Sequence, residues 1–134
     1  MTVVDTSVVV AAFASWHESH EIAARALRPG TRLIAQCAVE TYSVLTRLPP
    51  PHRAPADIVS KFLSERFPEE FLMLDSARLK ALLKSLPSLD ITGGAAYDAV
   101  IGATAAHVGA TLLSFDRRAA GTYERTGCDL KLLL

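Results

Sequence analysis

The sequence predicts an α/β domain, a three-layer α/β/α sandwich around a central parallel sheet of about five strands. Two observations predict it. Short continuous apolar runs, as expected of parallel strands covered on both faces, recur along the chain. Segments whose apolar residues have helical spacing lie between these runs. Strands separated by helical segments are typical of a parallel sheet with helices on both faces.

Five apolar runs are expected to form the sheet. They span residues 1–4, 32–35, 71–74, 111–115 and 129–133. Three apolar stripes mark helices between them: Ile22-Ala23-Ala26-Leu27, Ile58-Val59-Phe62-Leu63 and Leu79-Leu82-Leu83-Leu86. The first of these helices should start near His17 and end at Pro29-Gly30. Two further helices are expected over residues 37–47 and 95–108, the second of them ended by Gly109.

Composition indicates one soluble domain that covers residues 1–134, with 50% hydrophobic and 21% charged residues. Because 14 basic residues balance 14 acidic ones, any contact with nucleic acid needs a local basic patch. Cys37 and Cys128 form no CxxC motif, which favours a reducing compartment and leaves a disulfide between them open. No apolar run approaches the roughly 20 residues that span a bilayer, so we expect a cytoplasmic protein without membrane contact.

Four acids fall where an open parallel sheet binds its ligands, at the carboxyl ends of the strands. Asp5 ends the first strand and Asp116 follows the strand 111–115. Helices run antiparallel to these strands, so their first turns lie at the same edge. Asp98 and Glu40 are expected in the first turns of two such helices. Four carboxylates from four segments should therefore converge.

Each acid also has an ordinary structural explanation. Asp5 and Asp98 are suited to a helix cap or a helix dipole, Glu40 to a first helical turn, and Asp116 to a tight turn. Together, however, the four would repel one another by roughly 1–4 kcal/mol per pair at 4 Å. A cation removes that cost, and all-oxygen clusters prefer Mg²⁺ or Mn²⁺. We therefore interpret Asp5 as a metal ligand.

Three segments and a final short strand carry a resemblance to a known family. The segments are "VVDTSVVVAAF", "AVETYSVLTRL" and "AAYDAVIGATAAHVGATLLSFDRR". Through them the chain resembles the PIN-domain ribonucleases, and most closely the VapC-type toxins of bacterial toxin–antitoxin pairs. The likeness covers essentially the whole chain in length and order, and its combination of motifs is specific although each motif alone is weak.

The resemblance implies a metal-dependent endoribonuclease that inhibits translation and growth. Its catalytic acids would be Asp5, Glu40, Asp98 and Asp116, with Asp5, Asp98 and Asp116 as ligands of Mg²⁺ or Mn²⁺. Thr6 or Ser7 matches the hydroxyl beside the first acid, and Ser114 matches the small polar residue two before the last. The family also implies a homodimer, silenced by a cognate antitoxin that lies across the active-site groove.

Several other features of the sequence have more than one interpretation. Arg117, Arg118 and Arg47 are candidate RNA phosphate contacts, with ordinary solvated surface as the alternative. The histidines of "HESHE" (17–21) are three apart, which is not the HExxH spacing. Core packing is favoured for Trp16, with a partner-binding anchor as the alternative. The rival function is a catalytically inactive PIN-like module that binds RNA or protein.

Overall fold

A computed structural model describes all 134 residues of the chain as a parallel sheet between helices. Its strands are β1 (Thr2–Val4), β2 (Arg32–Leu33), β3 (Thr111–Ser114) and β4 (Asp129–Leu132). They are ordered β2-β1-β3-β4, and all neighbours are parallel. Val4 of the central strand β1 pairs with Leu33 on one side and Leu113 on the other. The predicted α/β architecture is confirmed.

The sheet has four strands rather than five, because the predicted strand 71–74 makes only one bridge. Leu72 pairs with Ile34, its N–H donating to the carbonyl of Leu33 at 2.9 Å. The neighbouring strand β2 is only two residues long, and helix α3 begins at Ala35 immediately after it. A longer partner strand therefore finds no further backbone groups to bond.

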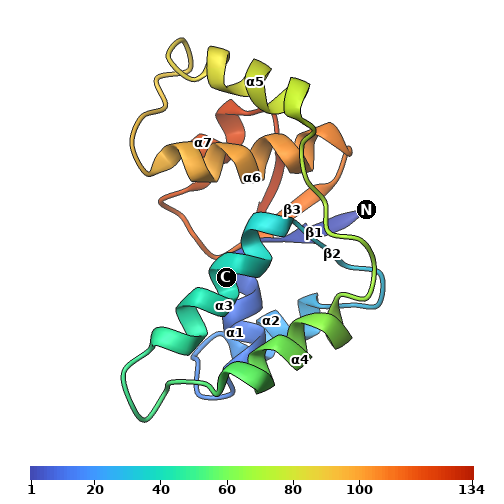
Figure 1. The fold of residues 1–134 in the computed structure, drawn as a ribbon, viewed down its shortest axis with the longest axis vertical. Coiled ribbons are helices and arrows are strands. Elements are labelled where there is room, and N and C mark those ends of the chain that lie inside the picture. Colours follow the sequence, from blue (N-terminus) through green and yellow to red (C-terminus); the bar gives the residue numbers. More distant parts are fainter.

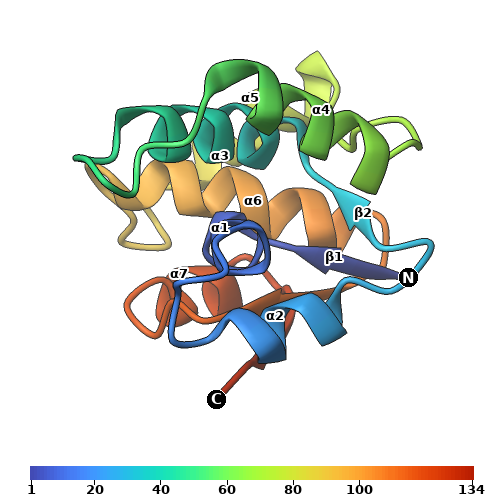
Figure 2. The same ribbon diagram turned by 90° about the horizontal axis from the view of Figure 1, so that it is seen from below.

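Seven helices surround the sheet, and the predicted helical stripes fall on them. They are α1 (Thr6–Phe13), α2 (His20–Ala26), α3 (Ala35–Arg47), α4 (Ala56–Arg66), α5 (Ser76–Ser85), α6 (Ala95–His107) and α7 (Ala120–Arg125). Figure 1 shows α5, α6 and α7 at the top and α1 to α4 at the bottom, with the strands between them. The turned view in Figure 2 places α3 and α6 on one side of β1 and α2 and α7 on the other.

One predicted helix start is wrong. Helix α2 begins at His20 rather than near His17, because residues 14–20 form successive turns: the N–H of His17 donates to Ala14 and the N–H of His20 to His17. Trp16 lies in these turns. It is 48% exposed and stacks on His52 with ring centroids 4.0 Å apart, so the favoured core role is wrong.

One hydrophobic core lies between the sheet and the helices that surround it. Val3 and Val4 of β1, Leu112 of β3 and Val8 of α1 are all completely buried in it. Cys37 and Cys128 are buried as free thiols, so the disulfide that the sequence left open does not form. None of the helices is both long enough and apolar enough to cross a bilayer.

Gly102 of α6 lies where helix α7 packs against α6. A Cβ atom at this position would lie 2.3 Å from the Thr126 hydroxyl and 3.3 Å from the Tyr123 Cα atom. The absence of a side chain therefore lets α6 and α7 pack together, which fixes the position of Tyr123.

Candidate active site

Asp5 sits where the central strand becomes a helix. It directly follows β1 and is the N-cap of α1, accepting a hydrogen bond from the Val8 N–H at 3.4 Å. Its side chain is buried, and the carboxylate also accepts hydrogen bonds from the hydroxyls of Ser7, Ser114 and Tyr123. Burial raises the pKa of Asp5, and the four hydrogen bonds oppose that rise. Asp5 is therefore both a helix cap and the centre of a polar network.

Ser7 and Ser114 fix Asp5 from both sides. The Ser7 hydroxyl donates to Oδ1 of Asp5 and accepts the backbone N–H of Phe115 at 2.9 Å. The Ser114 hydroxyl donates to Oδ2 and accepts the N–H of Asp116 at 2.9 Å. These bonds connect the end of β1 to the end of β3, so both predicted supporting serines contact the acid that they were expected to support.

Tyr123 is a member of this network that the sequence did not point to. Its hydroxyl donates to Oδ2 of Asp5 at 2.9 Å, and its ring is buried in the core. It lies 118 positions from Asp5 on the short helix α7, so no motif spacing connects the two residues. Burial and the charge of Asp5 raise the pKa of Tyr123 far above its usual range, so the hydroxyl stays a donor.

Asp98 lies in the first turn of α6, as predicted, and is half-buried. No hydrogen bond reaches its carboxylate. Burial raises the pKa of Asp98, and the negative charges of Asp116, Glu40 and Asp5 raise it further, whereas Arg118 lowers it. Repulsion by the other three acids therefore adds to burial in favouring the protonated form of Asp98.

Glu40 lies in the second turn of α3, not the first, because that helix begins at Ala35. Its Oε2 accepts the Thr6 hydroxyl at 2.9 Å, and its Oε1 accepts the Gln36 amide at 2.9 Å. Gln36 also donates to the carbonyl of Tyr97 on α6 at 3.1 Å. Thr6 and Gln36 therefore hold Glu40 in place, and the sequence had singled out only Thr6.

Asp116 follows β3 and caps the turn after it. Its Oδ1 accepts the N–H groups of Arg118 at 3.0 Å and Ala119 at 3.2 Å, and its Oδ2 lies 3.9 Å from the Arg118 guanidinium. No backbone N–H donates to Oδ2. Asp116 therefore caps a tight turn and also lies close enough to Asp98 for its charge to act there.

The three predicted arginines lie at different distances from these acids. Arg118 lines a cleft of about 460 Å³ together with Glu40 and Asp98. Arg47 lies on α3, lines a neighbouring hollow that also includes Glu40, and donates to the Ser43 hydroxyl at 3.1 Å. Arg117 is exposed, and no contact joins its side chain to the cleft. Arg118 therefore lies in the cleft with two of the acids, whereas Arg117 lies on the exposed surface.

The donor set is of the kind that a hard divalent cation needs, although no three acidic, histidine or cysteine side chains already stand in metal-binding positions. Burial raises the pKa of Asp98 and repulsion by the neighbouring acids adds to the rise; a bound cation would relieve that repulsion. In the "HESHE" segment, the ring of His20 is hydrogen-bonded to the Ala11 carbonyl at 2.9 Å.

Comparison with known proteins places this geometry in a family. The model of the PIN domain matches residues 2–124. Ribonuclease VapC40 of Mycobacterium tuberculosis is 52% identical over 129 residues, which cover 96% of each chain. Ribonuclease VapC27 of the same organism is 40% identical over 126 residues, covering 92% of this chain and 90% of the relative. The chain therefore belongs to the PIN-domain family and, within it, to the VapC proteins.

Proposed function

We propose that this chain is a metal-dependent endoribonuclease, the toxin of a toxin–antitoxin pair, which inhibits translation and growth by hydrolysing RNA. The observation that supports the proposal is that Glu40 and Asp98 line one cleft while Ser114 links Asp5 to the backbone of Asp116, so acids from four chain segments lie at one edge of the sheet. The relatives named as ribonucleases support it.

Asp5, Asp98 and Asp116 would hold Mg²⁺ or Mn²⁺. Asp98 offers a carboxylate without hydrogen bonds, and Asp116 offers an oxygen without backbone donors. Such an ion supplies charge neutralisation at the phosphate and makes water a better nucleophile at neutral pH.

The remaining polar residues have distinct roles in this proposal. Glu40, oriented by Thr6 and Gln36, faces the cleft and is placed to accept a proton from the attacking water. Arg118 lines the same cleft and would contact a phosphate of the RNA. Arg47 would contact the RNA farther along α3, and Arg117 would contribute from the exposed surface.

The first test is the metal dependence of cleavage. The purified chain should cut RNA with Mg²⁺ or Mn²⁺, stop when EDTA removes the ion, and resume when the ion is restored, as followed by gel electrophoresis. A chain that binds RNA or an antitoxin but never cleaves would be the inactive binding module. Full cleavage in EDTA would contradict the metal mechanism.

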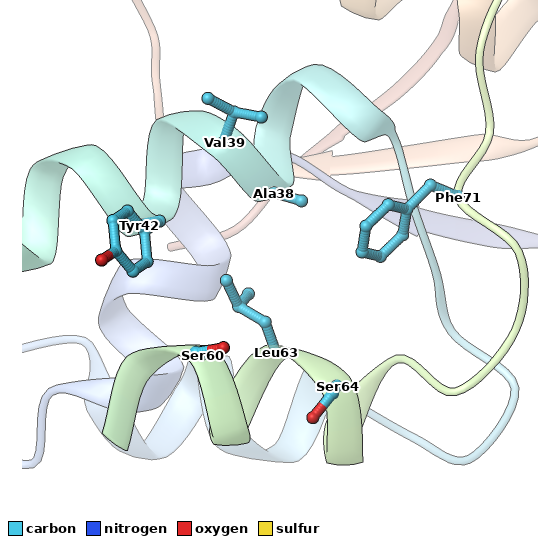
Figure 3. A pocket seen from close by; sticks show the side chains of 7 residues that line it. All are labelled: Ala38, Val39, Tyr42, Ser60, Leu63, Ser64 and Phe71. Atoms are coloured by element: carbon cyan, nitrogen blue, oxygen red, sulfur yellow. The ribbon is translucent and has the colours of Figure 1, made fainter. Parts of the chain in front are cut away.

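An apolar groove between α3 and α4 is the proposed docking site of the antitoxin. Figure 3 shows the side chains that line it: Ala38, Val39, Tyr42, Ser60, Leu63, Ser64 and Phe71. The groove measures about 360 Å³, and Phe71 at its rim is 43% exposed. Val39 lines both this groove and the adjoining hollow that includes Glu40, so the tail of an antitoxin helix seated in the groove would extend toward the acids.

Replacing Phe71 with serine should weaken antitoxin binding by at least about tenfold, because large aromatic anchors dominate such interfaces. RNA cleavage should keep its wild-type rate. The matched control is Met73→Ser on the same segment, since Met73 is 71% exposed and does not line the groove. Binding is measured by calorimetry with the purified antitoxin. Equal weakening by both substitutions would contradict the assignment of this groove.

We also propose that the chain forms a homodimer. Leu79 and Leu83 of α5 are 37% and 56% exposed, and Tyr97 of α6 is 65% exposed, so these helices leave apolar surface uncovered. Light scattering of the purified chain should give twice the mass of one chain, and the mass of a monomer at all concentrations would contradict the dimer.

A further inference from the structure

The hydrogen bonds to Asp5 occupy all the acceptor positions of its carboxylate. An ionised carboxylate offers about four lone-pair sites, two on each oxygen. Ser7 and the Val8 N–H take Oδ1, and Ser114 and Tyr123 take Oδ2. A cation that binds this carboxylate must therefore replace one of the four donors.

Of the two donors to Oδ2, Tyr123 is released more easily than Ser114. On Oδ1, the Val8 N–H lies 3.4 Å away and also donates to the Asp5 carbonyl. Ser7 and Ser114 each accept a backbone N–H as well, so moving either hydroxyl breaks two hydrogen bonds. The Tyr123 hydroxyl makes a single hydrogen bond, the one to Asp5, so its release breaks only that bond.

Tyr123 lies next to a residue that lines the cleft. Its neighbour Thr122 lines the cleft with Glu40 and Asp98, and the Tyr123 hydroxyl itself donates to Oδ2 of Asp5. A cation that binds Oδ2 of Asp5 would therefore meet this hydroxyl.

We propose that the Tyr123 hydroxyl competes with the metal ion for Asp5: it holds the carboxylate in the metal-free protein and releases it when a divalent cation binds. Tyr123 is then a positioning residue that acts through Asp5. This inference rests on the proposed function. It predicts that Tyr123→Phe destabilises the metal-free fold but tightens metal binding. If Tyr123 only supported the site, the same substitution would weaken both the stability of the fold and the binding of the metal.

The test is a calorimetric titration with Mn²⁺ of wild type, Tyr123→Phe and Tyr97→Phe. Tyr123→Phe should lower the Kd for Mn²⁺ on the order of tenfold, because the ion no longer displaces a hydrogen bond to a charged group. Tyr97→Phe should leave the Kd unchanged, since Tyr97 lines the same cleft but is 65% exposed and its hydroxyl donates to no carboxylate. In EDTA the Tm of Tyr123→Phe should fall by several degrees, and Mn²⁺ should raise it more than it raises the wild-type Tm.

A second readout needs no substitution at Tyr123. In a chain carrying Tyr42→Phe and Tyr97→Phe, Tyr123 is the remaining tyrosine of three. Its ultraviolet absorption should shift when Mg²⁺ is added, because the hydrogen bond to Asp5 is lost.

An unchanged or higher Kd for Tyr123→Phe, or an absorption spectrum that Mg²⁺ does not alter, would overturn the competition and leave the ribonuclease function standing. Equal losses of Tm in EDTA and in Mn²⁺ would show a structural role alone. A wild-type chain without a saturable Mn²⁺ site would overturn the proposed function and this inference with it.

Discussion

Asp98→Asn should reduce the rate of RNA cleavage at least about a hundredfold, the scale expected when a group that stabilises transition-state charge is lost. The amide has nearly the shape of the carboxylate but lacks its charge, so it is a poor ligand for a hard cation. The fold should tolerate the change, because no hydrogen bond to Asp98 is broken. The ratio of the two cleavage rates is measured from initial rates of wild type and variant on the same RNA at saturating Mg²⁺.

The matched control is Asp57→Asn. Asp57 is also an acid in the first turn of a helix, α4, but it is exposed and outside the cleft. Its substitution should leave the rate unchanged. If Asp98→Asn cleaved RNA at the wild-type rate, Asp98 would not be a catalytic residue.

Asp5→Ala should destabilise the protein by about 3 kcal/mol or more. It removes a helix cap, and it leaves the hydroxyls of half-buried Ser7 and of buried Ser114 and Tyr123 without their shared acceptor. Relief of the desolvated charge offsets part of this loss. Urea unfolding in EDTA, where no ion contributes, measures the difference in the free energy of unfolding.

Asp75→Ala is the appropriate comparison for Asp5→Ala. Asp75 is likewise an N-cap, of α5, and accepts the Arg78 N–H at 2.8 Å, but it is exposed. Its replacement should cost much less than that of Asp5. Equal losses would show that Asp5 is only a cap. Because of this expected instability, Asp98→Asn tests catalysis more cleanly than any substitution at Asp5.

The sequence predicted the parts of the site that depend on strand ends and helix starts. Asp5 and Asp116 follow strands, and Asp98 begins a helix, so the rules of a parallel sheet place them at one edge. The length of a strand was less predictable. The apolar run 71–74 reads as a strand, yet it bonds only as far as its short partner β2 allows.

Contacts made by residues distant in sequence were not predictable from spacing. Tyr123 reaches Asp5 because Gly102 lets α7 approach α6, and neither residue belongs to a motif. Gln36 contacts Glu40 because α3 starts two residues earlier than expected. Core packing was favoured for Trp16 over a partner-binding anchor, but the residue lies in a turn and stacks on His52 at the surface.

The raised pKa of Asp98 determines how its charge affects stability. Its folded-state pKa lies above the unfolded value, so in the metal-free protein its contribution to stability is present at low pH and is lost as the pH rises through the folded-state pKa. At pH 7 the charged side chain therefore opposes folding. Neutral Asp98→Asn removes this cost, and its advantage over wild type should shrink as the pH falls through the folded-state pKa of Asp98 and vanish below about 4.

In the proposed function, the acids converge to hold a metal ion. The most direct test is to measure the Tm of wild type and of Asp98→Asn at pH 7, first in EDTA and then in saturating Mn²⁺. In EDTA the variant should melt at or above wild type. Mn²⁺ at about 100 times its Kd adds about 2.7 kcal/mol to the wild type, or roughly 10 °C, and much less to the variant, so the order reverses. A variant that melts below wild type by the same amount in both conditions would make Asp98 a helix-end residue and contradict the metal site.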